Sequence, residues 1–126
     1  MENDKIQLDM LKSLLTSSFK FAELSLESLT YGKHVSDCDY ILSAQFLSIS
    51  QNEISKTKIY YANNIQMEHH HIELYFSVHN HFVQDLTDVI KSLDPDVTYA
   101  EKSLENLRDQ KDQVTAFIDY YHKVIK

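Results

Sequence analysis

Glycine and proline are almost absent from this chain of 126 residues, which has one of each, Gly32 and Pro95. Average usage would give roughly nine glycines and six prolines in a chain of this length. Sheets and tight turns use both residues, because turns require a positive φ or a preset φ. The near absence of both predicts an all-α fold, formed as one helical domain over residues 1–126.

The few helix-breaking residues divide the chain into segments of similar length. Gly32 favours a helix end, because glycine takes the left-handed conformation that often follows a helix. Asp94-Pro95-Asp96 favours a new start, since aspartate caps helices and proline fits the first turn. Asn63-Asn64 is the best break between them, because asparagine caps helices and tolerates left-handed φ. These breaks predict an antiparallel up-down-up-down four-helix bundle with helices over residues 4–31, 36–62, 65–93 and 95–125.

Two alternatives remain open for the middle of the chain. Residues 36–93 contain neither glycine nor proline. They are compatible with one continuous helix of about 87 Å, in an oligomer of chains with three long helices. Ser50-Gln51-Asn52-Glu53 has the form of a capping box, which would end the second helix early.

The last segment has the most regular apolar pattern in the sequence. Its residues follow heptad spacing, which predicts a coiled-coil-like seam against a neighbouring helix. One lysine interrupts the series, which consists of Val97, Ala100, Leu104, Leu107, Lys111, Val114, Ile118, Tyr121 and Ile125.

Charge and composition exclude several classes of function as first expectations. The formal net charge is −7, and no cluster of Lys and Arg is present to neutralise phosphates. We therefore expect neither nucleic-acid binding nor membrane insertion, and no stretch approaches 18 consecutive apolar residues. Cys38 is the only cysteine, so an intrachain disulfide is excluded. Without a signal-like N-terminus, a reducing, cytoplasmic location is expected.

Five of the seven histidines lie between residues 68 and 82, on the third expected helix. Its apolar stripe at spacings of three and four includes His69 and His79. The whole stripe consists of Ile65, His69, Ile72, Phe76, His79, Val83, Leu86, Ile90 and Leu93. We expect both imidazoles to be neutral and hydrogen-bonded in the core. Candidate partners on the second helix are Gln45, Glu53 and Lys56.

A metal site is the sharpest chemical hypothesis for the remaining histidines. No two histidines stand three or four residues apart, so they form no chelate by themselves. Carboxylates supply the spacing of di-iron bundles in Glu68-x-x-His71 and, with aspartate, in Asp119-x-x-His122. Antiparallel third and fourth helices would bring both pairs to one end of the bundle, where a divalent metal or iron is a possible cofactor. Against this, the pairs lie near helix ends and Asp119 lies off the heptad seam.

The same end of the bundle also has the composition of an interaction surface. The doublets at 60–61 and 120–121 each force one tyrosine ring outward, and we select Tyr61, His70 and Tyr120 as candidate contact residues. Without glycine-rich loops or a strained elbow, no catalytic residue is predicted. The leading hypothesis is a non-enzymatic protein–protein interaction or regulatory module, such as an adaptor, inhibitor or accessory subunit. Its partner would be another protein, and self-association into a homo-oligomer is left open; the alternative is the carboxylate–histidine metal protein.

Overall fold

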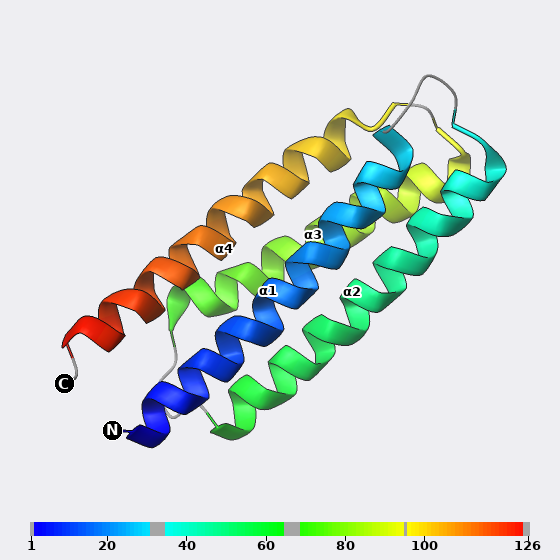
Figure 1. Ribbon diagram of the computed structural model, residues 1–126. Coiled ribbons are helices and arrows are strands. Elements are labelled where there is room, and N and C mark those ends of the chain that lie inside the picture. Colours follow the sequence, from blue (N-terminus) through cyan, green and yellow to red (C-terminus); the bar gives the residue numbers. More distant parts are fainter. Residues whose placement is uncertain (1, 31–34, 65–68, 95, 125–126) are drawn as a thin grey trace.

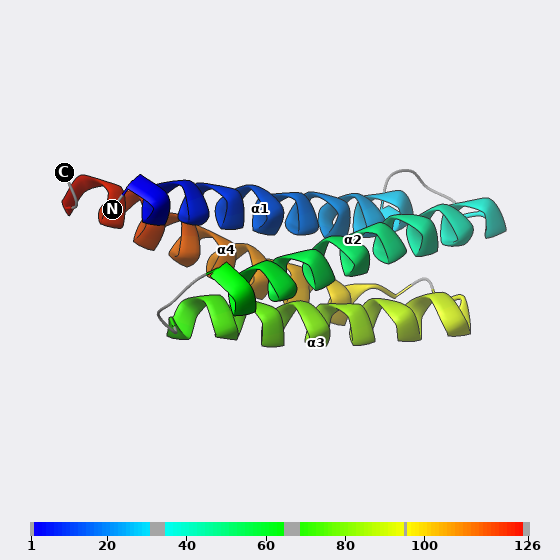
Figure 2. The same cartoon turned by 90° about the horizontal axis from the view of Figure 1, so that it is seen from below.

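The computed structural model describes residues 2–30, 35–64, 69–94 and 96–124. They form four helices: α1 (Glu2–Thr30), α2 (Asp37–Asn64), α3 (His70–Ser92) and α4 (Thr98–Val124). Each helix packs against the next along the chain, and α1 also packs against α4 (Figures 1 and 2). The expected all-α, four-helix bundle is confirmed. None of the described helices is long and apolar enough to cross a bilayer.

The two alternatives for the middle of the chain are wrong. α2 continues through the box at 50–53 without a break, and a separate α3 returns alongside it (Figure 1). Asn63-Asn64 is not itself the turn, because both residues belong to α2. Asn63 Nδ2 donates to Ile59 O at 2.9 Å, so this amide supports the last turn of the helix. The expected end at Gly32 lies outside the described residues.

Side-chain caps fix where α2 and α3 begin. Ser36 and Asp39 form a reciprocal capping box, in which Ser36 N donates to Asp39 Oδ2 at 2.8 Å and Asp39 N donates to Ser36 Oγ at 3.4 Å. α3 begins at His70, five residues later than expected. Its N-cap is His69, whose Nδ1 accepts a hydrogen bond from His71 N at 3.2 Å.

The connection from α3 to α4 differs from the predicted one. Leu93 takes a left-handed conformation with φ 50°, and Asp94 N donates to Val89 O at 3.0 Å, which closes the end of α3. α4 starts at Thr98, because Val97 O accepts its first helical hydrogen bond, from Glu101 N at 2.8 Å. The carboxylate that supports this end is that of Asp96 and not of Asp94, since Thr98 N donates to Asp96 Oδ1 at 3.0 Å. The Asp94 carboxylate accepts a hydrogen bond from Asp96 N at 2.9 Å.

Most of the heptad series of the last helix is buried as predicted, whereas the stripe of α3 is rotated. Val97 and Tyr121 are half-buried, and Ile125 lies outside the described residues. The buried series in α4 includes Ala100, Leu104, Leu107, Val114 and Ile118. Lys111 is half-buried, with Nζ 4.6 Å from the centre of the Phe19 ring. In α3 the expected Phe76 is only half-buried and Leu93 is exposed. The buried residues of α3 are Ile72, Tyr75, His79, Phe82, Leu86 and Val89.

Small hydroxyl side chains line the seam between α1 and α2. Ser50 Oγ donates to Ser18 O, and Ser43 Oγ donates to Ser25 O, each at 2.6 Å. These bonds run from a side chain on α2 to the backbone of α1, so the two helices lie close together. With the equally buried Thr57, the hydroxyl residues of α2 recur every seven positions.

Candidate functional site

The histidine end of the bundle brings α2, α3 and α4 together. His69 stacks on Phe117 of α4, with ring centres 3.6 Å apart. Tyr61 of α2 packs edge-on against Phe76, and its hydroxyl accepts a hydrogen bond from His69 N at 2.9 Å. The antiparallel placement expected for α3 and α4 is therefore seen in direct contacts.

The three predicted interaction residues have different roles at this end. Tyr61 is half-buried, and its hydroxyl donates to Glu73 Oε2 at 3.2 Å, so this side chain joins α2 to the start of α3. His70 is exposed, and Tyr120 is 68% exposed. His70 and Tyr120 are therefore on the surface, whereas the Tyr61 hydroxyl forms hydrogen bonds within the bundle.

The four predicted metal ligands are only partly described. Glu68 and the side chain of His122 lie outside the described residues. Asp119 is exposed and forms an ion pair with Lys12 Nζ at 3.0 Å. His71 Nδ1 is buried and has no hydrogen-bond partner among the described residues. In the described part of the chain, no three His, Cys, Asp or Glu side chains are grouped so as to hold a metal ion.

Partial burial keeps His69 from charging easily, although this ring is half-buried at the start of α3 and not in the core as expected. Desolvation lowers the pKa of His69, and the neighbouring His71 and His70 lower it further by charge repulsion. A neutral ring is also what the N-cap requires, because Nδ1 must keep a lone pair to accept the bond from His71 N.

His79 lies in the centre of the bundle and has a partner that the sequence did not suggest. Its Nε2 is 2.8 Å from Ser50 Oγ, and neither Gln45, Glu53 nor Lys56 takes that position. The Ser50 proton goes to Ser18 O, so His79 donates from Nε2 to Ser50 Oγ. Desolvation, with a smaller repulsion from Lys58, lowers the pKa of His79 to about 4.

The same polar network continues to Tyr75. Ser18 Oγ donates to Leu15 O at 2.6 Å, which leaves the Tyr75 hydroxyl to donate to Ser18 Oγ at 2.8 Å. A serine and a histidine at hydrogen-bond distance resemble a catalytic pair in chemistry. Ser50 is 0% exposed and His79 is 2% exposed, so a substrate has no access to the hydroxyl. The pair therefore belongs to the core.

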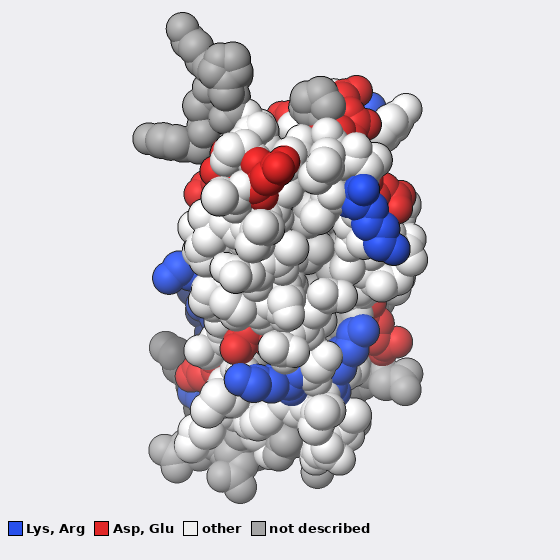
Figure 3. Space-filling view, turned by 90° about the vertical axis from the view of Figure 1, so that its right-hand side faces the viewer, with Lys and Arg blue, Asp and Glu red and all other residues white. Residues whose placement is uncertain are grey.

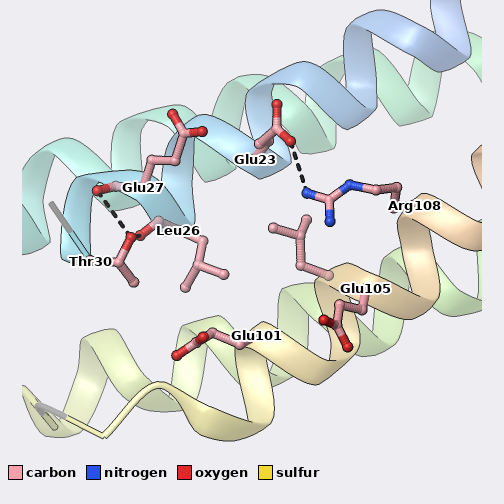
Figure 4. A pocket seen from close by; sticks show the side chains of 8 residues that line it. Glu23, Leu26, Glu27, Thr30, Glu101, Glu105 and Arg108 are labelled. Atoms are coloured by element: carbon pink, nitrogen blue, oxygen red, sulfur yellow. Dashed lines mark hydrogen bonds and ion pairs between the residues drawn. The ribbon is translucent and has the colours of Figure 1, made fainter.

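A pocket of about 230 Å³ lies between the end of α1 and the start of α4 (Figure 4). Glu23 and Glu27 line it from α1, and Glu101 and Glu105 line it from α4. Arg108 offsets part of this charge through its ion pair with Glu23 Oε2 at 3.0 Å. The pocket favours cationic groups by charge, but Glu27, Glu101 and Glu105 are exposed surface side chains, and the buried residues of its lining are Leu26 and Leu104.

Among the described residues, exposed large aliphatic side chains are most numerous on α2. We define the outer α2 face by the exposed aliphatic residues Ile41, Leu42, Ile49 and Ile59 together with the exposed polar residues between them, Gln45, Ser48 and Asn52. α2 forms the right-hand edge of the bundle in Figure 1, and Figure 3 looks at that edge. A broad area without charged side chains occupies its middle, with acidic groups at the upper margin and mainly basic groups at the lower one (Figure 3).

This face was not predicted from the sequence. Its signal was present, because large aliphatic residues occur all around α2 and do not follow one stripe. α2 buries Leu47 and Ile54, but its inward positions Ser43, Ser50 and Thr57 are small and polar, so the other large aliphatic side chains are on the outside.

No protein-family model, no curated protein and no solved structure matches the chain.

Proposed function

We propose that this chain is a non-enzymatic protein–protein interaction or regulatory module that docks another protein on the outer α2 face. The observation that carries the proposal is the exposure of four aliphatic side chains on one helix, at 59% for Ile41, 43% for Leu42, 37% for Ile49 and 63% for Ile59. Removal of apolar area of this kind from water by a partner lowers the free energy of the system. We also propose a cytoplasmic setting, in which the exposed Cys38 remains a thiol.

The magnitude of this gain limits what kind of interface the face supports. Covering a half-exposed aliphatic side chain contributes about 1 kcal/mol, so the four together contribute about 4 kcal/mol. Association costs about 4–15 kcal/mol in lost translational and rotational freedom. The aliphatic residues therefore need help from the polar residues between them and from charged groups at the margins.

Site-specific photo-crosslinking tests the proposal. A photo-crosslinking amino acid replaces Ile49 on the outer α2 face in one variant, and Tyr99 on α4, which is 78% exposed, in the control. Adducts formed in extracts of the source cells are identified by mass spectrometry, and the partner is then purified. Its Kd for the wild-type chain should rise at least about tenfold with Ile49→Asp and stay unchanged with Tyr99→Asp.

Two outcomes would contradict the proposal. One is the absence of any adduct specific to position 49, with the chain itself counted as a partner. The other is a purified partner that binds Ile49→Asp as tightly as the wild type.

Metal binding at the histidine end is the second candidate, with Glu68, His71, Asp119 and His122 as the proposed ligands. The observation that favours it is the buried Nδ1 of His71, because a buried imidazole nitrogen is normally satisfied by some partner. Asp119 would have to exchange Lys12 for the ion. Elemental analysis of untagged protein and a melt with EDTA test it. The bound metal should be lost in His71→Asn and kept in His70→Asn. Absence of metal from both variants would contradict metal binding at this end.

A further inference from the structure

We propose that the occupant of the outer α2 face is a second copy of this chain, whose α2 lies antiparallel to the first. This inference rests on the proposed function and names the partner of the same surface. Its basis is the order of charges along α2, which makes the face complementary to its own image.

Acidic and basic residues stand at opposite ends of this face. Asp37 and Asp39 are in the first turn of α2, and Lys56 and Lys58 are near its end. From residue 40 to residue 52 the helix has no charged residue. Figure 3 shows the same order on the surface, with acidic groups above the uncharged area and mainly basic groups below it.

Two of these four charges are available to a partner. Asp39 is occupied by the capping box with Ser36, and Lys58 Nζ lies over the Phe76 ring at 5.8 Å. Asp37 is exposed, and the Lys56 side chain is 63% exposed although it forms an ion pair with Glu53 at 3.3 Å. Asp37 and Lys56 therefore mark the two ends of the docking surface.

A two-fold axis satisfies both ends at once. Asp37 and Lys56 are 19 residues apart in the sequence, or about 28 Å along the helix. When two α2 helices cross antiparallel with the axis midway between these residues, each Asp37 meets the Lys56 of the other copy. Ile41, Leu42 and Ile49 of both copies then share the middle. Ile59 lies beyond Lys56 and outside this overlap.

The overall charge of the chain favours this surface over others for self-association. Two copies with a formal charge of −7 each repel one another, and the repulsion is smallest where acidic side chains are absent. The uncharged middle of the outer α2 face meets that condition. An isologous two-fold contact is also the commonest arrangement of homo-oligomers, because one surface serves both partners.

Charge reversal with rescue tests the inference in the full chain. Sedimentation equilibrium should show a concentration-dependent dimer for the wild type. Asp37→Lys and Lys56→Glu should each raise the dimer Kd about tenfold, because each substitution puts like charges at two symmetric positions. The double variant Asp37→Lys/Lys56→Glu should recover most of the loss, since the pairs are restored with reversed signs.

Two substitutions check the position of the contact. Ile49→Asp should give a monomer, whereas Tyr99→Asp, on α4 and outside the outer α2 face, should dimerise like the wild type. All of these side chains are exposed, so circular dichroism melts should show that each variant is folded. Higher salt should weaken the wild-type dimer, because the end pairs lie at the rim.

The inference is overturned if the wild type stays monomeric from low to high micromolar concentration. It is also overturned if the dimer survives Ile49→Asp, or if the double charge variant is no tighter than the single ones. A monomeric wild type that still forms an adduct with a different protein at position 49 removes the second copy as occupant and leaves the proposed function standing. A chain with no adduct of either kind there removes both.

Discussion

The seam between α1 and α2 is lined by small hydroxyl side chains, whereas α4 meets the rest of the core with leucine, valine and isoleucine. In the first seam, Ser43 and Ser50 donate to backbone carbonyls of α1 at 2.6 Å. In α4, Leu107 and Val114 are completely buried and provide only apolar contact. The first arrangement depends on close approach and satisfied hydrogen bonds, and the second depends on filled volume.

This difference explains why exposed aliphatic side chains lie on α2. α2 buries Leu47 and Ile54, but a hydroxyl residue fills every seventh inward position. Its other large aliphatic residues, including Ile41, Ile49 and Ile59, are on the outside. The outer α2 face is thus a consequence of how α2 packs, and the proposed interaction follows from the same choice of residues.

Removing volume from the apolar side should have the largest effect. We expect Leu107→Ala to lower the free energy of unfolding by about 3–4 kcal/mol, because the substitution loses buried area and leaves a cavity. Leu107→Met keeps the volume and should lose less than about 1.5 kcal/mol. Urea denaturation at pH 7.5 measures both. Equal losses in the two variants would show that this position is not packed as tightly as the structure indicates.

Acidification should break the polar network at its centre. The pKa of His79 is about 4 in the folded state against 6.5 in the unfolded chain. A base with a lowered pKa in the folded state contributes its full stability above pH 6.5, and that contribution is lost as the pH falls from 6.5 to 4. The loss amounts to about 3 kcal/mol.

Urea denaturation at several pH values between 7 and 4 measures this loss. In His79→Gln, the amide keeps a donor for Ser50 and does not titrate, so most of the pH dependence should disappear. His69→Asn is the control for the other histidine with a lowered pKa, and it should keep the larger part of the slope. A wild-type stability that does not change between pH 6.5 and 4.5 would contradict a neutral, buried His79.

Adding volume should damage the hydroxyl-lined seam. We expect Ser43→Leu to lower the free energy of unfolding by about 2–3 kcal/mol, because a larger side chain forces α1 and α2 apart and the bond to Ser25 O is lost. Ser48→Leu, on the exposed side of the same helix, is the matched control and should change stability by less than about 0.5 kcal/mol. Thermal and urea denaturation of both variants test the expectation. A Ser43→Leu variant as stable as the wild type would mean that the two helices are not closely packed there.

The sequence predicted those parts of the molecule in which a residue type has a single structural role. The heptad of α4 and the shortage of glycine and proline predicted the helices and their order, because large apolar residues at heptad spacing lie on one side of a helix and are buried together. Helix ends were less predictable: α4 begins at Thr98, where the Asp96 carboxylate and not that of Asp94 accepts the hydrogen bond from Thr98 N.

The candidate site was predicted less well, for a physical reason. The partners expected for His79 were long polar side chains, but a short serine side chain reaches a histidine when the two helices are close together. The outer α2 face was not predicted, because in a sequence an exposed aliphatic residue cannot be told from a core residue. The structure separates them by showing that Ser43, Ser50 and Thr57 occupy inward positions. His70 and Tyr120 are on the surface as predicted, whereas the hydroxyl of Tyr61 is used within the bundle.

The smallest effects should separate the two serines of the seam from one another. Ser43→Ala removes one hydrogen bond to a backbone carbonyl and should cost about 1 kcal/mol. Ser50→Ala removes a similar bond and also leaves the Nε2 donor of His79 buried without an acceptor, so we expect about 2 kcal/mol. Combined with His79→Leu, the Ser50→Ala loss should fall toward that of Ser43→Ala, because the orphaned donor is gone. Equal losses from the two serine variants, unchanged by His79→Leu, would place His79 outside the network and reduce the seam to a set of independent bonds.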